Sequence, residues 1–237
     1  MLLYIVRHGI PDYATDTLKP GGELQAKAVA RRLAVHGIDE IYSSPLGRAR
    51  QTAQPTCEAL GLPMQIEPWM SESVAWQHFC CKTADGRNTW AFNKRGMKLG
   101  KDEHYADRDS FHHGFYHDEA LAAEGARALA AASDEFLSRL GYTRIGEGGG
   151  NGYRVTAGND RRIAAFCHQG FGLHWIAHLL NIPYHIFTAS FDISHTGVTI
   201  IRFSGEEIAY PQCLCLSDLS HIYGDGLPLR YHDNLDI

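Results

Sequence analysis

Leu2-Leu3-Tyr4-Ile5-Val6-Arg7-His8-Gly9 opens the chain with five apolar residues, a charged pair and a glycine. An apolar run that stops this abruptly predicts a buried strand over residues 2–7, followed by a tight turn. Open α/β sheets form their ligand crevices at the carboxyl ends of their strands. Arg7 and His8 are therefore candidate site residues, because a guanidinium presents a fork of donors suited to phosphate and an imidazole can act as a base or nucleophile.

Strand and helix patterns alternate along much of the rest of the chain. Apolar spacing and closing glycines predict helices over 22–36, 46–60, 119–140 and 171–180, and further strands over 40–43, 64–66, 163–167 and 196–203. Such alternation is typical of parallel strands joined by crossover helices. We therefore expect a three-layer α/β/α fold with a mostly parallel central sheet.

Residues 70–118 interrupt this alternation. They are rich in aromatic residues and histidine, show neither the helical nor the strand period, and are too apolar for a disordered linker. We expect one domain over residues 1–237, with residues 70–118 inserted as a cap that covers the edge of the sheet and selects the substrate.

A glycine-rich run over residues 146–152 lies between two short strand-like segments. A phosphate-binding loop is disfavoured there, because no Lys-Ser/Thr pair follows and no helix begins. We expect a hairpin loop.

Composition excludes several classes of protein. The 237 residues carry a formal charge of -5, so no basic footprint indicates a nucleic-acid partner. No apolar run approaches the roughly eighteen residues that a membrane span needs, and no charged segment precedes the first apolar run as in a signal peptide. The six cysteines lack Cys-x-x-Cys spacing. We expect a reduced cytoplasmic protein with no metal, cofactor, nucleic-acid partner or membrane contact, and we assign no oligomeric state.

Two later strand ends also supply reactive groups. Ser43-Ser44-Pro45-Leu46 follows the strand at 40–43 and precedes Arg48, and His168 follows the strand at 163–167. In a parallel sheet these ends meet the end of the first strand at one edge. This edge of the sheet would then hold two imidazoles, guanidinium groups and helix N-termini. Such a combination predicts a pocket for a dianionic phosphoryl group.

Four segments resemble signatures of the histidine phosphatase superfamily, also called the phosphoglycerate mutase-like family. The closest similarity lies in the third segment, and two departures are Lys19 in place of a threonine and Gln169 in place of a frequent glycine. The segments are Tyr4-Ile5-Val6-Arg7-His8-Gly9, Leu18-Lys19-Pro20-Gly21-Gly22-Glu23-Leu24-Gln25-Ala26, Ser43-Ser44-Pro45-Leu46-Gly47-Arg48-Ala49-Arg50-Gln51-Thr52-Ala53 and Cys167-His168-Gln169-Gly170-Phe171. The resemblance brackets most of the chain but leaves residues 75–160 uncovered.

The resemblance implies a phosphoglycerate mutase-like fold and a metal-independent phosphomonoester hydrolase that acts on a small phosphorylated metabolite. His8 would attack phosphorus and become phosphohistidine, and the phosphoryl oxygens would be held by Arg7, Arg48 and His168. The family also uses an acidic residue after the third strand to protonate the leaving oxygen. Glu72 fits that place best, with Glu67 and Asp85 as the alternatives.

Residues beside this cluster are candidates for substrate contact: Asp12, Tyr13 and Gln169. Phosphoglycerate mutases carry a Ser/Thr and an Asn soon after the first signature, where this chain has Ile10-Pro11-Asp12-Tyr13, and this difference disfavours a glycolytic mutase. The alternatives left open are another phosphomutase, a non-catalytic protein that binds a phosphate ligand, and a metal site formed by His112, His113 and His117.

Overall fold

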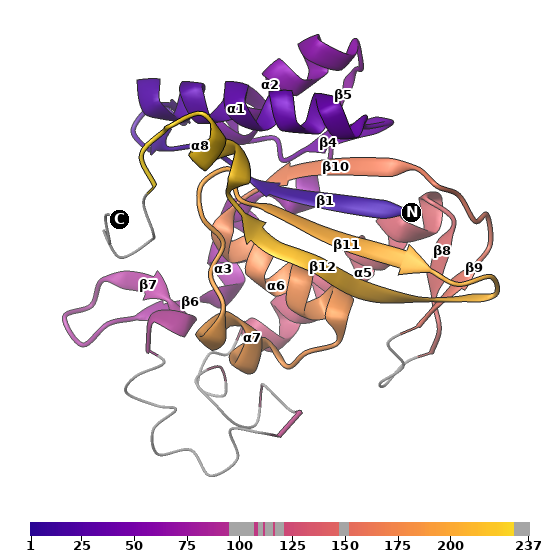
Figure 1. The fold of residues 1–237 in the computed structure, drawn as a ribbon. Coiled ribbons are helices and arrows are strands. Elements are labelled where there is room, and N and C mark those ends of the chain that lie inside the picture. Colours follow the sequence, from indigo (N-terminus) through magenta and orange to yellow (C-terminus); the bar gives the residue numbers. More distant parts are fainter. Residues whose placement is uncertain (95–106, 109–110, 112–115, 117–120, 147–151, 230–237) are drawn as a thin grey trace.

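The computed structural model describes residues 1–94, 107–108, 111, 116, 121–146 and 152–229. Its centre is a mixed eight-stranded sheet in the order β5-β4-β10-β1-β11-β12-β9-β8 (Figure 1). The strands are β1 (Leu2–Arg7), β4 (Glu40–Ser43), β5 (Met64–Ile66), β8 (Tyr142–Arg144), β9 (Tyr153–Val155), β10 (Arg162–Cys167), β11 (Val198–Ser204) and β12 (Ile208–Asp218). Two small hairpins pair β2 (Pro11–Asp12) with β3 (Thr17–Leu18) and β6 (Cys80–Lys82) with β7 (Asn88–Trp90).

The expected α/β class is confirmed, but the sheet is parallel in only half of its width. Strands β5, β4, β10 and β1 run parallel, whereas β11, β12, β9 and β8 each run antiparallel to the strand before them in the sheet. Strands β11 and β12 follow each other directly, and antiparallel partners need only such a short connection. The pairing of β8 with β9 confirms the hairpin expected around residues 146–152, of which 147–151 lie outside the described residues.

Helices cover both faces of the sheet and complete the three layers (Figure 1). One face carries α1 (Pro20–His36), α2 (Gly47–Leu60) and α8 (Ser220–Gly224), and the other carries α3 (Glu72–Phe79), α5 (Ala122–Arg139), α6 (Gln169–Leu180) and α7 (Tyr184–Ser190). Helix α1 begins two residues before the predicted start because proline suits the first helical position, where no backbone N–H is needed. Within the described ranges, no helix has the length and apolar character needed to cross a membrane.

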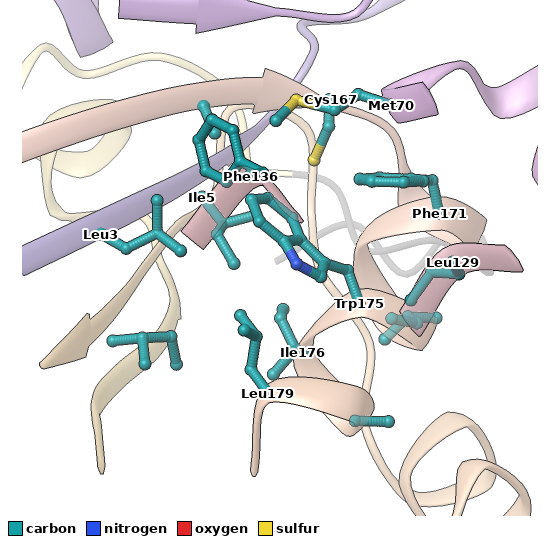
Figure 2. Close-up of a cluster of buried hydrophobic side chains, with 14 of the residues drawn as sticks. Leu3, Ile5, Met70, Leu129, Phe136, Cys167, Phe171, Trp175, Ile176 and Leu179 are labelled. Atoms are coloured by element: carbon teal, nitrogen blue, oxygen red, sulfur yellow. The ribbon is translucent and has the colours of Figure 1, made fainter. Parts of the chain in front are cut away.

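Strand β1 separates two hydrophobic clusters because its side chains alternate between the faces of the sheet. Leu3 and Ile5 face the larger cluster, with Trp175 of α6 at its centre (Figure 2). Tyr4 and Val6 face the smaller cluster beneath α1 and α2. Burying one such aliphatic side chain stabilises a fold by about 1.5–3 kcal/mol, so these clusters fix the position of β1 and of the turn that follows it.

The described part of the 70–118 insert is more regular than its sequence pattern indicates. It begins with the 3₁₀ turn η1 (Pro68–Met70) and helix α3, continues through the β6–β7 hairpin, and reaches a second 3₁₀ turn, η2 (Ala91–Lys94). The hairpin lies at the side toward which β1 and β10 point with their carboxyl ends (Figure 1). A Cβ atom on Gly170, in the first turn of α6, would lie 2.4 Å from the Trp90 ring, so this part of the insert packs against the start of α6.

Candidate active site

Parallel pairing places the carboxyl ends of β1, β10 and β4 at the same edge of the sheet. Arg7 of β1 is in register with Cys167 of β10, and Phe166 is in register with Ser43 of β4. The next residue on each strand therefore projects from one edge of the sheet, and the His8 N–H continues the ladder to the Cys167 carbonyl at 2.9 Å. The rings of His8 and His168 lie with their centroids 5.1 Å apart.

His8 is held as a neutral imidazole with one nitrogen available for attack. Its Nδ1 lies 2.7 Å from the Gly9 carbonyl oxygen. Because a carbonyl oxygen only accepts hydrogen bonds, Nδ1 carries the proton and the lone pair is on Nε2. Burial and the positive charge of Arg7 keep the His8 pKa well below its usual value, so the ring stays neutral at pH 7.

His168 and two arginines present buried hydrogen-bonding atoms that the fold leaves unpaired. The Nε2 of His168 lies 2.7 Å from the Ser44 hydroxyl, and burial lowers the His168 pKa well below its usual value. Its Nδ1 and the Nε atoms of Arg7 and Arg48 are buried without a partner among the described residues. Buried polar atoms are ordinarily satisfied, so these three groups together suit an anion that accepts hydrogen bonds from them.

Asp16 fixes Arg48 at the start of α2. One carboxylate oxygen pairs with the Arg48 guanidinium, and the other accepts the Gly47 N–H at 2.6 Å. Asp16 adopts a left-handed φ of +53°, which aspartate tolerates better than most residues. A Cβ on Gly47 would lie 2.3 Å from the Asp16 carbonyl oxygen, so the close approach requires glycine there. The sequence analysis did not identify Asp16.

Glu72 lies between the insert and α6. It is the first residue of α3, and its two carboxylate oxygens accept the backbone N–H groups of Gly170 at 3.0 Å and Phe171 at 2.8 Å. Burial raises the Glu72 pKa, although these hydrogen bonds and the charges of Arg7 and Arg48 oppose the shift. A raised pKa favours the protonated carboxyl that a general acid requires.

The two alternative acids have other partners. Glu67 pairs with Arg139 at 2.7 Å and accepts the Trp69 indole N–H at 2.8 Å. Asp85 is exposed in the β6–β7 hairpin, where hydrogen bonds from Thr83 and Arg87 lower its pKa. The structure therefore brings Glu72, and neither alternative, next to the α6 turn that follows His168.

The three expected substrate-contact residues differ in position. Tyr13 is exposed and lies with its ring 5.4 Å from the Arg48 guanidinium carbon. Asp12 accepts the Ala14 N–H at 3.0 Å within its own turn. The Gln169 side chain is buried and donates to Asp192, in the loop before β11. Tyr13 thus lies beside Arg48 of the candidate site. Asp12 instead bonds to the backbone of its own turn, and Gln169 bonds to the loop before β11.

The remaining polar signature residues support the turn that carries His8. Thr52 accepts the Gly9 N–H at 3.0 Å, and Gln25 accepts the Ile10 N–H at 3.0 Å. A Cβ on Gly22 would lie 2.2 Å from the Ile10 carbonyl oxygen, so α1 reaches this turn only because residue 22 is glycine. These residues position the turn, while His168, Arg7 and Arg48 present the buried nitrogens that have no partner among the described residues.

His195 is the second residue that the sequence analysis missed. It precedes β11, its ring centroid lies 5.6 Å from that of His8, and its Nε2 lies 3.1 Å from a terminal nitrogen of Arg7. The second terminal nitrogen of Arg7 donates to the Ile193 carbonyl at 2.7 Å. The loop before β11 therefore holds both terminal nitrogens of Arg7.

Side chains that could bind a metal ion are distributed singly or in pairs among the described residues. In the part of the chain that the structure describes, no group of three or more His, Cys, Asp or Glu side chains is placed to hold a metal ion. The histidines at 112, 113 and 117, which the sequence leaves open as a metal site, lie outside the described residues. The six cysteines all lie in the described ranges, and no disulfide joins any of them.

Comparison with known proteins matches the stretch that holds the first three of the four signature segments. Residues 3–79 match the model of the histidine phosphatase superfamily (branch 1). A probable phosphoglycerate mutase of Serratia proteamaculans is 37% identical over 79 residues, and one of Yersinia pestis is 38% identical over the same length. Each match covers 30% of this chain and 37% of the relative, so the likeness spans little more than a third of those proteins.

Solved structures extend the similarity to the whole fold. A phosphoserine phosphatase of Entamoeba histolytica in complex with 3-phosphoglyceric acid has a TM-score of 0.60 at 20% identity, over 93% of this chain and 98% of that one. A mycobacterial glucosyl-3-phosphoglycerate phosphatase has a TM-score of 0.60 at 19% identity, over 91% and 98%. At these identities the likeness shows the fold alone. Residues 3–79 therefore carry the sequence pattern of the histidine phosphatase superfamily, and the fold around them is the one that these solved structures share.

Proposed function

We propose that this protein is a metal-independent phosphomonoester hydrolase that transfers the phosphoryl group of a small phosphorylated metabolite first to His8 and then to water. The observation that carries the proposal is the state of His8. Its Nδ1 is bonded to the Gly9 carbonyl, and its Nε2 is left as a nucleophile beside His168 and Arg7. The proposal includes a small-molecule substrate as the partner and no cofactor.

The first half-reaction forms a bond between His8 Nε2 and phosphorus and breaks the bond between phosphorus and the ester oxygen. Arg7, Arg48 and His168 hold the phosphoryl oxygens, and their donors stabilise the charge that develops there. Glu72 gives its proton to the leaving oxygen, so an alcohol departs and Glu72 is left as a carboxylate. In the second half-reaction, the oxygen of a water molecule bonds to phosphorus as the bond between phosphorus and His8 Nε2 breaks, and the Glu72 carboxylate accepts a proton from that water. Phosphate leaves, and His8 and Glu72 return to their starting states.

The charge of the pocket supports a dianionic substrate. Two guanidiniums lie at the site, and both histidines have pKa values well below the usual range. The two structural relatives named above are phosphatases by name, which agrees with hydrolysis.

A phosphomutase is the second candidate, because the two sequence relatives named above are probable phosphoglycerate mutases. The two activities share the phosphohistidine and differ in the second acceptor. Water accepts the phosphoryl group in a phosphatase, whereas a substrate oxygen accepts it in a mutase.

A screen of phosphorylated metabolites in ¹⁸O-labelled water tests both candidates. We expect release of phosphate that contains one ¹⁸O atom, and no activity from the His8→Ala variant. His36→Ala is a matched control, since His36 lies at the end of α1, outside the site. Phosphate transfer to a second position of the substrate without ¹⁸O incorporation would identify a mutase instead. No turnover with any substrate would favour the non-catalytic alternative.

A further inference from the structure

Arg7 is a buried cation whose hydrogen-bond partners are uncharged. One terminal nitrogen donates to the Ile193 carbonyl at 2.7 Å, and the other faces His195 Nε2 at 3.1 Å. Among the described residues, no carboxylate forms an ion pair with Arg7, although the charges of Asp192 and Glu72 act on it from a greater distance. Buried charges in proteins are ordinarily paired, so Arg7 keeps a positive charge that an anion can use.

The contact between Arg7 and His195 fixes the protonation state of this third imidazole. A guanidinium has only donors, so His195 Nε2 must accept with its lone pair. An imidazolium has no such lone pair, and therefore His195 is neutral with its proton on Nδ1. Arg7 is held in this way by a group that leaves its charge uncancelled.

The backbone around His195 is rigid and locally strained. Thr196 adopts a left-handed φ of +55°, which costs about 1–3 kcal/mol for a residue other than glycine. Its N–H donates to the Arg7 carbonyl at 3.0 Å, and the Ser194 N–H donates to the Ser217 hydroxyl at 2.8 Å. Hydrogen bonds on both sides of His195 thus hold an unfavourable turn that presents the imidazole to Arg7.

We propose that His195 is a positioning residue that aims the Arg7 guanidinium at the phosphoryl group and does so as a neutral acceptor. The inference rests on the proposed phosphoryl site. The two arginines of the site differ in the charge of their partners, because the Arg48 guanidinium pairs with the Asp16 carboxylate, whereas Arg7 faces the neutral imidazole of His195. A carboxylate at position 195 would hold Arg7 equally well, but it would cancel the charge of Arg7 and repel the dianion.

The test compares two nearly isosteric substitutions that differ in charge. His195→Gln keeps a neutral acceptor at this reach, His195→Glu replaces it with a charged one, and His195→Ala removes it. Calorimetry with inorganic phosphate and with vanadate measures the Kd of each variant, thermal melting checks the fold, and steady-state kinetics give kcat and KM for the best substrate of the screen.

We expect His195→Gln to bind anions within about threefold of wild type, His195→Ala about tenfold more weakly and His195→Glu about a hundredfold more weakly, in line with the strength of hydrogen bonds to charged groups. Equal Kd values for the Gln and Glu variants would overturn the neutral-acceptor role. A lowered melting temperature with unchanged Kd in all three would assign His195 a merely structural role and also overturn the inference.

The outcomes for wild type separate this inference from the proposed function. Wild-type protein that binds the anions but hydrolyses nothing would contradict the phosphatase proposal, while the comparison of variants would still decide the role of His195. Wild-type protein that binds neither anion would overturn the phosphoryl site and this inference together.

Discussion

His8 and His168 face each other across two parallel strands, with ring centroids 5.1 Å apart although 160 positions separate them in the sequence. The register that pairs Arg7 with Cys167 produces this juxtaposition, because each histidine is the next residue of its strand. Burial and neighbouring arginines keep the pKa of both rings well below the usual value. Two neutral imidazoles can thus lie close together, one able to attack and the other to bind oxygen.

Arg48 and His168 are expected to bind the phosphoryl group from separate strand ends. Arg48→Ala and His168→Ala should each weaken phosphate or vanadate binding about 10- to 100-fold, since hydrogen bonds to charged groups are worth about 1.5–3 kcal/mol. Isothermal calorimetry measures the change. Arg50→Ala is the control, because Arg50 is exposed on the same helix. Unchanged affinity in the Arg48 and His168 variants would refute this pocket.

Glu72 is expected to protonate the leaving oxygen. Glu72→Gln should slow hydrolysis of an alkyl phosphate about 10²- to 10⁴-fold, the range typical of general acids, but should slow an activated aryl phosphate far less because its leaving group needs little protonation. The ratio of kcat/KM values for the two esters is the measurement. Glu67→Gln provides the comparison and should affect both esters alike. Equal losses in the Glu72 variant would exclude it as the acid.

Activity is expected to be independent of divalent metal, because guanidiniums and imidazoles can supply the groups that hold the phosphoryl oxygens. Assays after dialysis against excess EDTA should retain the full rate, and added Mg²⁺, Mn²⁺ or Zn²⁺ should not increase it. A rate that falls on chelation and returns with one metal would contradict this expectation.

Stability is expected to fall in mild acid because of His174. Burial lowers the pKa of His174 from 6.5 to about 4, despite a hydrogen bond to the Gly170 carbonyl. Between these pKa values the unfolded chain binds a proton that the folded chain does not, so the unfolding free energy decreases as pH falls below about 6.5. At pH 5 this single group costs about 2 kcal/mol.

Urea unfolding at pH 7 and pH 5 measures that loss. His174→Gln should be less stable at pH 7, because it replaces a buried side chain, but should lose less stability than wild type on going to pH 5. An equally steep loss in both proteins would assign the acid sensitivity to other groups.

The parallel half of the fold was predictable because its signals are local. The central strands β1 and β10 are apolar runs followed by polar residues, and the ends of parallel strands meet at one edge. Arg7, His8, Arg48 and His168 were identified in this way. The insert was less predictable, since α3 and the β6–β7 hairpin are short and bury mixed aromatic faces that show no sustained period.

His195 was missed because of the direction of one strand. A strand was expected near residues 196–203, and in a parallel sheet its amino end would lie at the edge remote from His8. Strand β11 instead runs antiparallel to β1, with Val6 opposite Val198, so its amino end lies at the same edge as His8. Asp16 was missed for a different reason, since its contact with Arg48 depends on a turn whose shape the sequence does not specify.

Trapping the phosphoenzyme tests the central claim most directly. Wild-type protein mixed with a ³²P-labelled substrate and quenched within milliseconds should carry an acid-labile, base-stable phosphate, and peptide mapping should locate it on His8. The His8→Ala variant should carry no label while keeping the melting temperature near that of wild type. Label on any other residue of the active protein, or turnover by the His8→Ala variant, would contradict the account.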